Sequence, residues 1–72
     1  MTIQSERRNV LSPLHIQILQ TLADGVTVEQ TAKDVKLSYH TLKNYTKTIR
    51  ETMGADTTIQ AVAMALRRGL IE

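Results

Sequence analysis

The chain lacks cysteine, and this absence removes disulfides from the means by which so short a domain can be stabilised. Its two histidines, His15 and His40, are too few to complete a structural zinc site without cysteine. A chain of 72 residues is one small domain, and it buries only about 60% of its unfolded surface. Stability must therefore come from a well-packed core or from self-association, and the absence of cysteine also fits a reducing compartment.

Long hydrophobic runs are also missing, and no charged-then-apolar leader opens the sequence. We therefore expect a cytoplasmic protein with no membrane partner. No nucleophile lies beside a base, no paired carboxylates sit in an apolar setting, and the three glycines form no phosphate-binding loop. The sequence thus predicts that the chain is not an enzyme and that it needs no cofactor or metal.

Charge is unevenly distributed along the chain, although the whole sequence carries only +2. Residues 1–32 and residues 51–72 each sum to −1. Residues 33–50 sum to +4, because one acidic residue, Asp34, is set against five basic ones: Lys33, Lys36, Lys43, Lys47 and Arg50. A solvated helix face would explain this concentration as well as contact with a polyanion would.

Start and stop signals divide the sequence into helices. Ser12 is a good N-cap, and Pro13 follows at the first helical position, where its missing N–H costs nothing. Glycines follow the ends of three apolar helical stripes, at Gly25, Gly54 and Gly69. No segment alternates with the period of a strand. The chain is therefore predicted to be all-α.

Two further helix starts have the pattern of a capping box, Thr27 with Gln30 and Thr57 with Gln60. The predicted helices cover residues of about 13–24, 28–35, 39–53 and 58–68. They form one domain over residues 11–72. Residues 1–10 have no sustained apolar period, and we interpret them as a flexible tail or the remnant of a linker.

The second and third predicted helices are separated only by Lys36 and Leu37, the short turn of a helix-turn-helix. In that motif the second helix enters the major groove of DNA with its N-terminal end first. Lys43, Lys47 and Arg50 are spaced i, i+4, i+7, so they point the same way from the helix that starts at Ser38. Lysine can donate to guanine edges or phosphate, and an asparagine such as Asn44 can pair with adenine.

A larger set of residues resembles a known family in both order and spacing. These residues are Leu11-Ser12-Pro13, Leu19, Leu22-Ala23-Asp24-Gly25, Ala32, Leu37-Ser38, Thr41-Leu42-Lys43-Asn44, Ile49, Met53-Gly54, Gln60-Ala61-Val62-Ala63 and Arg67-Arg68-Gly69-Leu70-Ile71. Together, over residues 11–71, they resemble the LuxR-type (GerE-type) helix-turn-helix domain of bacterial transcription regulators.

The resemblance implies a four-helix domain whose third helix contacts double-stranded DNA in the major groove. The base-contacting positions of the family fall on Lys43, Asn44 and Lys47. Its backbone-contacting positions fall on or near Thr27, Ser38, His40 and Thr41, and Arg50 extends the same basic face. The function implied is that of a sequence-specific regulator of transcription.

The sequence departs from the family pattern at Leu14, Gln17, Thr31, Lys36, Tyr45 and Thr46. Thr31 and Thr46 replace the usual apolar residues, so we expect two core contacts to be weakened or rearranged. Lys36 stands where the family favours glycine, and a left-handed backbone there would cost roughly 1 kcal/mol. Tyr39 or Tyr45 could stack on a base. Tyr45 falls on the apolar stripe, however, so we expect it in the core. We interpret His15 as a partly buried packing residue.

Helix four is commonly the dimer interface in this family, and we expect a homodimer through residues 58–68. Ile59, Val62, Ala63 and Leu66 are predicted to form the inner face of this helix, which leaves Met64, Ala65 and Arg68 for the interface. An alternative is a protein-interaction module or adaptor that modulates RNA polymerase or a larger LuxR-type regulator. Salt separates the two, because binding through phosphates weakens steeply as salt rises.

Overall fold

The computed structural model describes residues 11–72, and the predicted tail at residues 1–10 lies outside the described residues. The helices are α2 (Pro13–Ala23), α3 (Val28–Asp34), α4 (Tyr39–Met53) and α5 (Thr58–Arg67). The described part of the chain contains no strand, so the all-α prediction is confirmed. All four predicted starts are confirmed, and three helices end one residue earlier than predicted.

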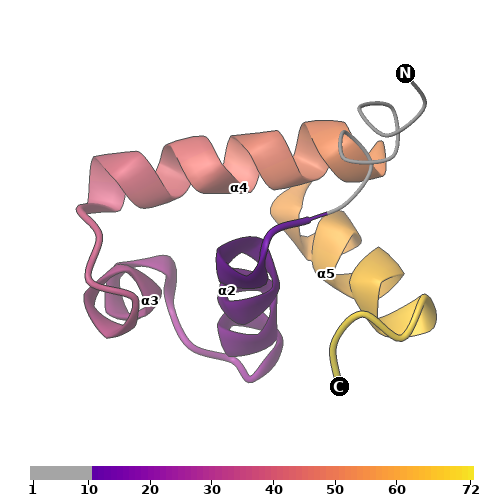
Figure 1. Ribbon diagram of the computed structural model, residues 1–72, viewed down its shortest axis with the longest axis horizontal. Coiled ribbons are helices and arrows are strands. Elements are labelled where there is room, and N and C mark those ends of the chain that lie inside the picture. The colour runs from indigo at the N-terminus through magenta and orange to yellow at the C-terminus, as the bar shows by residue number, and fades with distance from the viewer. Residues whose placement is uncertain (1–10) are drawn as a thin grey trace.

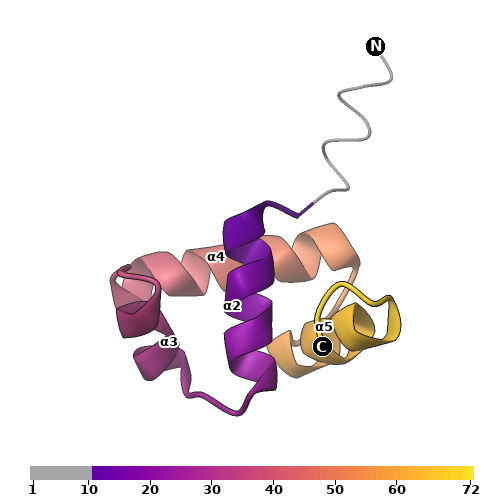
Figure 2. The same cartoon turned by 60° about the horizontal axis from the view of Figure 1, so that its bottom comes forward.

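The helices are arranged around α2. Figure 2 shows α2 crossing the middle of α4, and Figures 1 and 2 both show α3 on one side of α2 and α5 on the other. α2 contacts each of the other three helices. Ile18 and Leu19 of α2, Leu42 and Ile49 of α4, and Ala61 of α5 are all buried in the resulting core. None of the helices in this part of the chain is long and apolar enough to cross a membrane.

Each of the helices α2 to α5 begins at a hydroxyl N-cap, which accepts a hydrogen bond from the backbone N–H three residues later: Ser12, Thr27, Ser38 and Thr57. Only Ser12 completes a capping box, because the side chain of His15 accepts from the backbone N–H of Ser12. The two predicted glutamine boxes are half formed. Gln30 donates to Asp34 instead, and Gln60 accepts from the backbone of Asp56.

Each helix also ends in the same way, with a left-handed residue after the last turn. At Gly25, Gly54 and Gly69 φ lies between 73° and 89°, and at Lys36 it is 63°. The C-terminal end of α3 illustrates the bonding. The N–H of Lys36 donates to the carbonyl of Lys33, and the N–H of Leu37 donates to the carbonyl of Ala32. This is the Schellman pattern, which satisfies carbonyls that the helix itself leaves free. Lys36 is thus left-handed, as the family's preference for glycine there suggested.

Two threonines occupy core positions. Thr46 is 7% exposed, and its hydroxyl donates to the backbone carbonyl of Lys43 at 2.8 Å. Thr31 is 0% exposed, and its hydroxyl has no hydrogen-bond partner. Burying an unpaired hydroxyl at Thr31 costs free energy that Thr46 avoids through its hydrogen bond.

The inner face of α5 differs from the predicted one. Ala61 and Ala65 are fully buried, whereas Ile59 is 83% exposed and Leu66 is 45% exposed. The prediction that Ile59 and Leu66 cover the interior was therefore wrong. Ala65, assigned to the dimer interface, lies inside the core and cannot contact a partner. The small alanines let α5 pack close to α2 and α4.

After α5, the C-terminal residues return to α2. Ile71 is buried in the core. The side chain of Gln20 donates to the carbonyl of Glu72 at 2.8 Å and accepts from its N–H at 2.9 Å. These two bonds hold the last described residues against α2.

Candidate nucleic-acid interface

The turn between α3 and α4 fixes how α4 is presented. α3 ends at Asp34 and α4 begins at Tyr39, so only four residues connect them. Lys36 reverses the chain with its positive φ, and Ser38 starts the new helix by accepting from the N–H of Thr41 at 3.0 Å. α3 and α4 are in contact. The geometry is that of a helix-turn-helix with α4 as its second helix.

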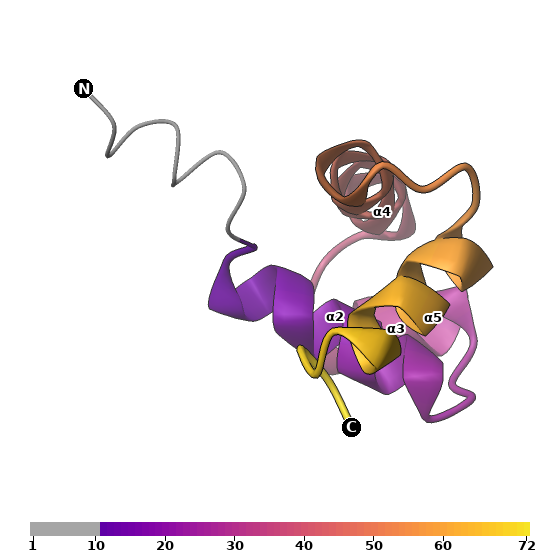
Figure 3. The ribbon, with the colours of Figure 1, turned by 90° about the vertical axis from the view of Figure 1, so that its right-hand side faces the viewer.

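One long side of α4 is left uncovered by the other described helices. Figure 3, which looks nearly along α4, shows the other three helices lying to one side of it. Leu42, Ile49 and Met53 are buried on that side. Lys43, Asn44 and Lys47 are exposed. The structure thus brings the three predicted base-contacting residues together on the outer side of the second helix of the motif.

Hydroxyl groups gather at the N-terminal ends of α3 and α4. The Ser38 hydroxyl accepts from the N–H of Thr41 and donates to the Thr41 hydroxyl at 2.9 Å, which leaves the proton of Thr41 free for an outside acceptor. Thr27 accepts from the N–H of Gln30 at 3.1 Å and keeps its own proton. His40 is exposed in the first turn of α4. These donors suit a phosphate near the positive end of the helix dipoles.

Arg50 is the one predicted contact whose side chain the structure ties to another helix. Its Nη1 donates to the Thr58 hydroxyl at 2.9 Å, and Arg50 is half-buried. The bond links the last turns of α4 to the first turn of α5. Arg50 retains further N–H donors, but its reach toward a ligand is limited by this contact.

Two further residues on α4 were not among the predicted contact residues, although the sequence left base stacking by Tyr39 open. Tyr39 is 47% exposed, and the Nζ of Lys43 lies 5.6 Å from the centre of its ring. Glu51 is exposed one turn beyond Lys47, where it adds a negative charge to the basic side of the helix. The i, i+4 spacing of both pairs is the sequence signal that could have indicated them.

His15 packs where α2 meets α4. Its ring lies 5.4 Å from that of Tyr45, with 58° between their planes. Its Nδ1 accepts from the Ser12 N–H at 3.0 Å, and burial lowers the pKa of His15 below its usual 6.5. The predicted packing roles of His15 and Tyr45 agree with these contacts, since both are half-buried and Tyr45 packs against the core.

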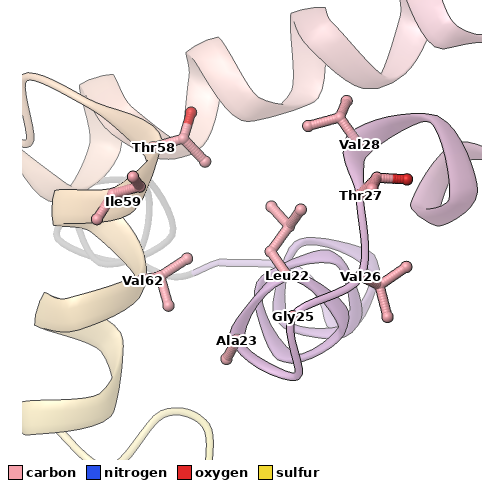
Figure 4. Close-up of a pocket in the computed structure, with 9 residues that line it drawn as sticks. All are labelled: Leu22, Ala23, Gly25, Val26, Thr27, Val28, Thr58, Ile59 and Val62. Carbon is pink, nitrogen blue, oxygen red and sulfur yellow. The ribbon is translucent and has the colours of Figure 1, made fainter.

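An apolar pocket of about 460 Å³ opens where the C-terminal end of α2, the start of α3 and the start of α5 meet. Figure 4 shows Leu22 projecting between the first turns of α5 and α3. Its lining carries no titratable group: Leu22, Ala23, Gly25, Val26, Thr27, Val28, Thr58, Ile59 and Val62. Among the described residues, no cluster of three potential metal ligands exists. The pocket offers no catalytic chemistry.

A family comparison agrees with this geometry. The model of the family described as "Bacterial regulatory proteins, luxR family" (GerE) matches residues 9–65. The match spans the helix-turn-helix and most of α5, and the chain belongs to this family. Its domain is thus of the DNA-binding class found in transcription regulators, which are not enzymes. Searches of the curated proteins and of the solved structures each found no match.

Proposed function

We propose that the chain binds double-stranded DNA sequence-specifically, with α4 in the major groove, and thereby regulates transcription in the bacterial cytoplasm. The observation that carries the proposal is the exposure of Lys43, Asn44 and Lys47 on the uncovered side of α4. The two lysines can donate to guanine O6 and N7, and Asn44 can pair with adenine N6 and N7. Contact with RNA polymerase belongs to the alternative, a protein-interaction module or adaptor.

Contacts with the DNA backbone would set the depth and register of α4. Thr27, Ser38, His40 and Thr41 lie at the N-terminal ends of the two helices, where donors and helix dipoles favour phosphate. Arg50 would reach a phosphate with the N–H groups that Thr58 leaves free. These contacts supply affinity for any sequence, whereas the base contacts supply the preference.

Selection of bound sites from random duplexes tests the proposal directly. Lys43→Ala and Lys47→Ala should each weaken binding to the selected site by about 1–3 kcal/mol without lowering helical content. Lys33→Ala is a matched control, because Lys33 is also exposed but lies on α3. Unchanged affinity in both α4 variants would show that α4 does not contact the bases. Binding that salt does not weaken would favour the protein-interaction module instead.

The second part of the proposal is a homodimer through the outer face of α5. Ile59 and Leu66 are exposed apolar residues spaced i, i+7, so they share one side of α5, and Leu70, which follows the end of the helix, is exposed as well. This face replaces the buried Ala65 as the interface. Met64 is half-buried and Arg68 is exposed, but at 3.6 residues per turn both lie about 140–180° around α5 from Ile59 and Leu66, so they are not part of it. Two copies joined here would address half-sites about 34 Å apart in an inverted repeat.

Leu66→Glu tests the interface, because it places a charge in the middle of the proposed contact. The variant should have the mass of a monomer in analytical ultracentrifugation and should lose cooperative binding to the full site. Gln60→Glu is the control: it adds the same charge to α5 and retains the acceptor that bonds the N–H of Asp56. A dimer that persists in Leu66→Glu would contradict this interface.

A further inference from the structure

Tyr39 occupies a place on α4 that the proposed contacts leave unused. It is the first residue of the helix and one of four exposed large hydrophobic residues in the described part of the chain, with 47% of its surface exposed. Lys43 follows one turn later, and its Nζ lies 5.6 Å from the centre of the tyrosine ring. An aromatic ring thus lies directly beside a lysine proposed to contact a base.

This separation is within the range in which the face of an aromatic ring attracts a cation, about 6 Å from its centre. The direction of the lysine follows from the helix, because helical side chains lean toward the N-terminus and onto the residue one turn earlier. A free lysine has many rotamers, and holding it in one of them before binding reduces the entropy lost on binding. The ring therefore restricts Lys43 and holds its ammonium near the start of α4.

We propose that Tyr39 is a positioning residue for Lys43: it directs the ammonium toward the N-terminal end of α4, the end that enters the groove, and so increases affinity and base preference through Lys43 alone. The inference rests on the proposed function, since it assumes that Lys43 contacts DNA. Tyr39 itself is not assigned a contact with DNA, and its hydroxyl has no part in the role.

A double-mutant cycle on the selected DNA site measures this dependence. The proteins are the parent, Tyr39→Leu, Lys43→Ala and the double variant, with affinity measured by fluorescence anisotropy at one fixed salt concentration. Tyr39→Leu keeps an apolar side chain but removes the ring, so it should weaken binding about two- to fivefold. In the Lys43→Ala background the same change should have no effect. Tyr39→Phe, which keeps the ring and removes only the hydroxyl, should bind as the parent does.

A second readout follows the contact itself rather than the affinity. In the free protein, the ring current of Tyr39 should shift the Lys43 side-chain protons upfield in NMR spectra. The shift should persist in Tyr39→Phe and disappear in Tyr39→Leu. In Tyr39→Leu, the base preference at the position contacted by Lys43 should become weaker. The base preferences at the other positions of the site should not change.

Each other outcome overturns one specific statement. If Tyr39→Leu weakens binding equally with and without Lys43, or if Tyr39→Phe binds weakly, then Tyr39 contacts DNA itself and the positioning role is wrong. If Tyr39→Leu binds as tightly as the parent while Lys43→Ala binds weakly, the ring does not assist the lysine. If Lys43→Ala binds as the parent does, the base contact of the proposed function fails, and the role of Tyr39 fails with it.

Discussion

Thr31 offers the sharpest test of how this small core is stabilised. Its side chain is completely buried on α3, and its hydroxyl has no hydrogen-bond partner. Valine has nearly the same shape, the same branching at Cβ and a similar helix propensity. Thr31→Val therefore removes the unpaired polar atom and places a methyl group in the same space.

The expected gain follows from the cost of an unsatisfied buried group. Leaving such a group without a partner costs about 1–3 kcal/mol, and the substitution leaves no other donor or acceptor unpaired because the Thr31 hydroxyl bonds to none. We expect Thr31→Val to raise the free energy of unfolding by about 1–2 kcal/mol. For a domain of this size, each kcal/mol raises the melting temperature by roughly 4–8 °C.

Thr46→Val is the matched control. Thr46 is also buried, but its hydroxyl donates to the carbonyl of Lys43, so the substitution exchanges one hydrogen bond for apolar burial. Its effect should be close to zero. Urea unfolding followed by circular dichroism at equal protein concentration compares the two variants with the parent. A Thr31→Val protein that is no more stable than Thr46→Val would show that the buried hydroxyl is not a cost.

Three further predictions concern the turn between α3 and α4, the helix α2 and the C-terminal end of α4. Lys36→Gly should raise the free energy of unfolding by at most ~1 kcal/mol, because glycine tolerates φ of 63° but gains freedom in the unfolded chain; urea titration would disprove this by showing a loss. Because burial lowers the pKa of His15, stability is fully present above pH 6.5 and falls as the pH drops toward the folded-state pKa. His15→Gln, which keeps an acceptor for Ser12, should reduce that fall between pH 7.5 and 5.5. Glu51→Gln should tighten DNA binding up to about fivefold at low salt, and an equal gain at high salt would refute a charge effect.

Local chemistry explains why the helix boundaries could be predicted so closely. An N-cap hydroxyl and a left-handed C-terminal residue act within one turn of the chain, so Ser12, Thr27 and Gly54 indicate their roles without knowledge of the fold. The exposed side of α4 was predictable for the same reason, because the period of its apolar residues fixes the opposite face. The family resemblance added which of the exposed residues to connect with DNA.

Contacts between helices, and side chains with several partners in reach, were less predictable. Gln30 lies at the capping-box spacing from Thr27, yet it bonds Asp34 one turn later, and both choices are compatible with the sequence. The bond from Arg50 to Thr58 joins two helices. It depends on the angle between α4 and α5, which no pattern within either helix specifies. The sequence therefore predicted the exposed side of α4, but not the hydrogen bond to Thr58 that restricts the Arg50 side chain.

The inverted face of α5 shows why residue size alone misplaces a helix. Ile59 and Leu66 are more apolar than Ala61 and Ala65, so the stripe of larger residues was assigned to the core. In the fold, the space between α2 and α4 admits α5 only where its side chains are small, and the alanines are fully buried there. Ala65→Glu would consequently place a charge inside the core and destabilise the monomer. The large apolar residues face outward, and burying them requires another surface, for which a second copy of α5 is the partner that we propose.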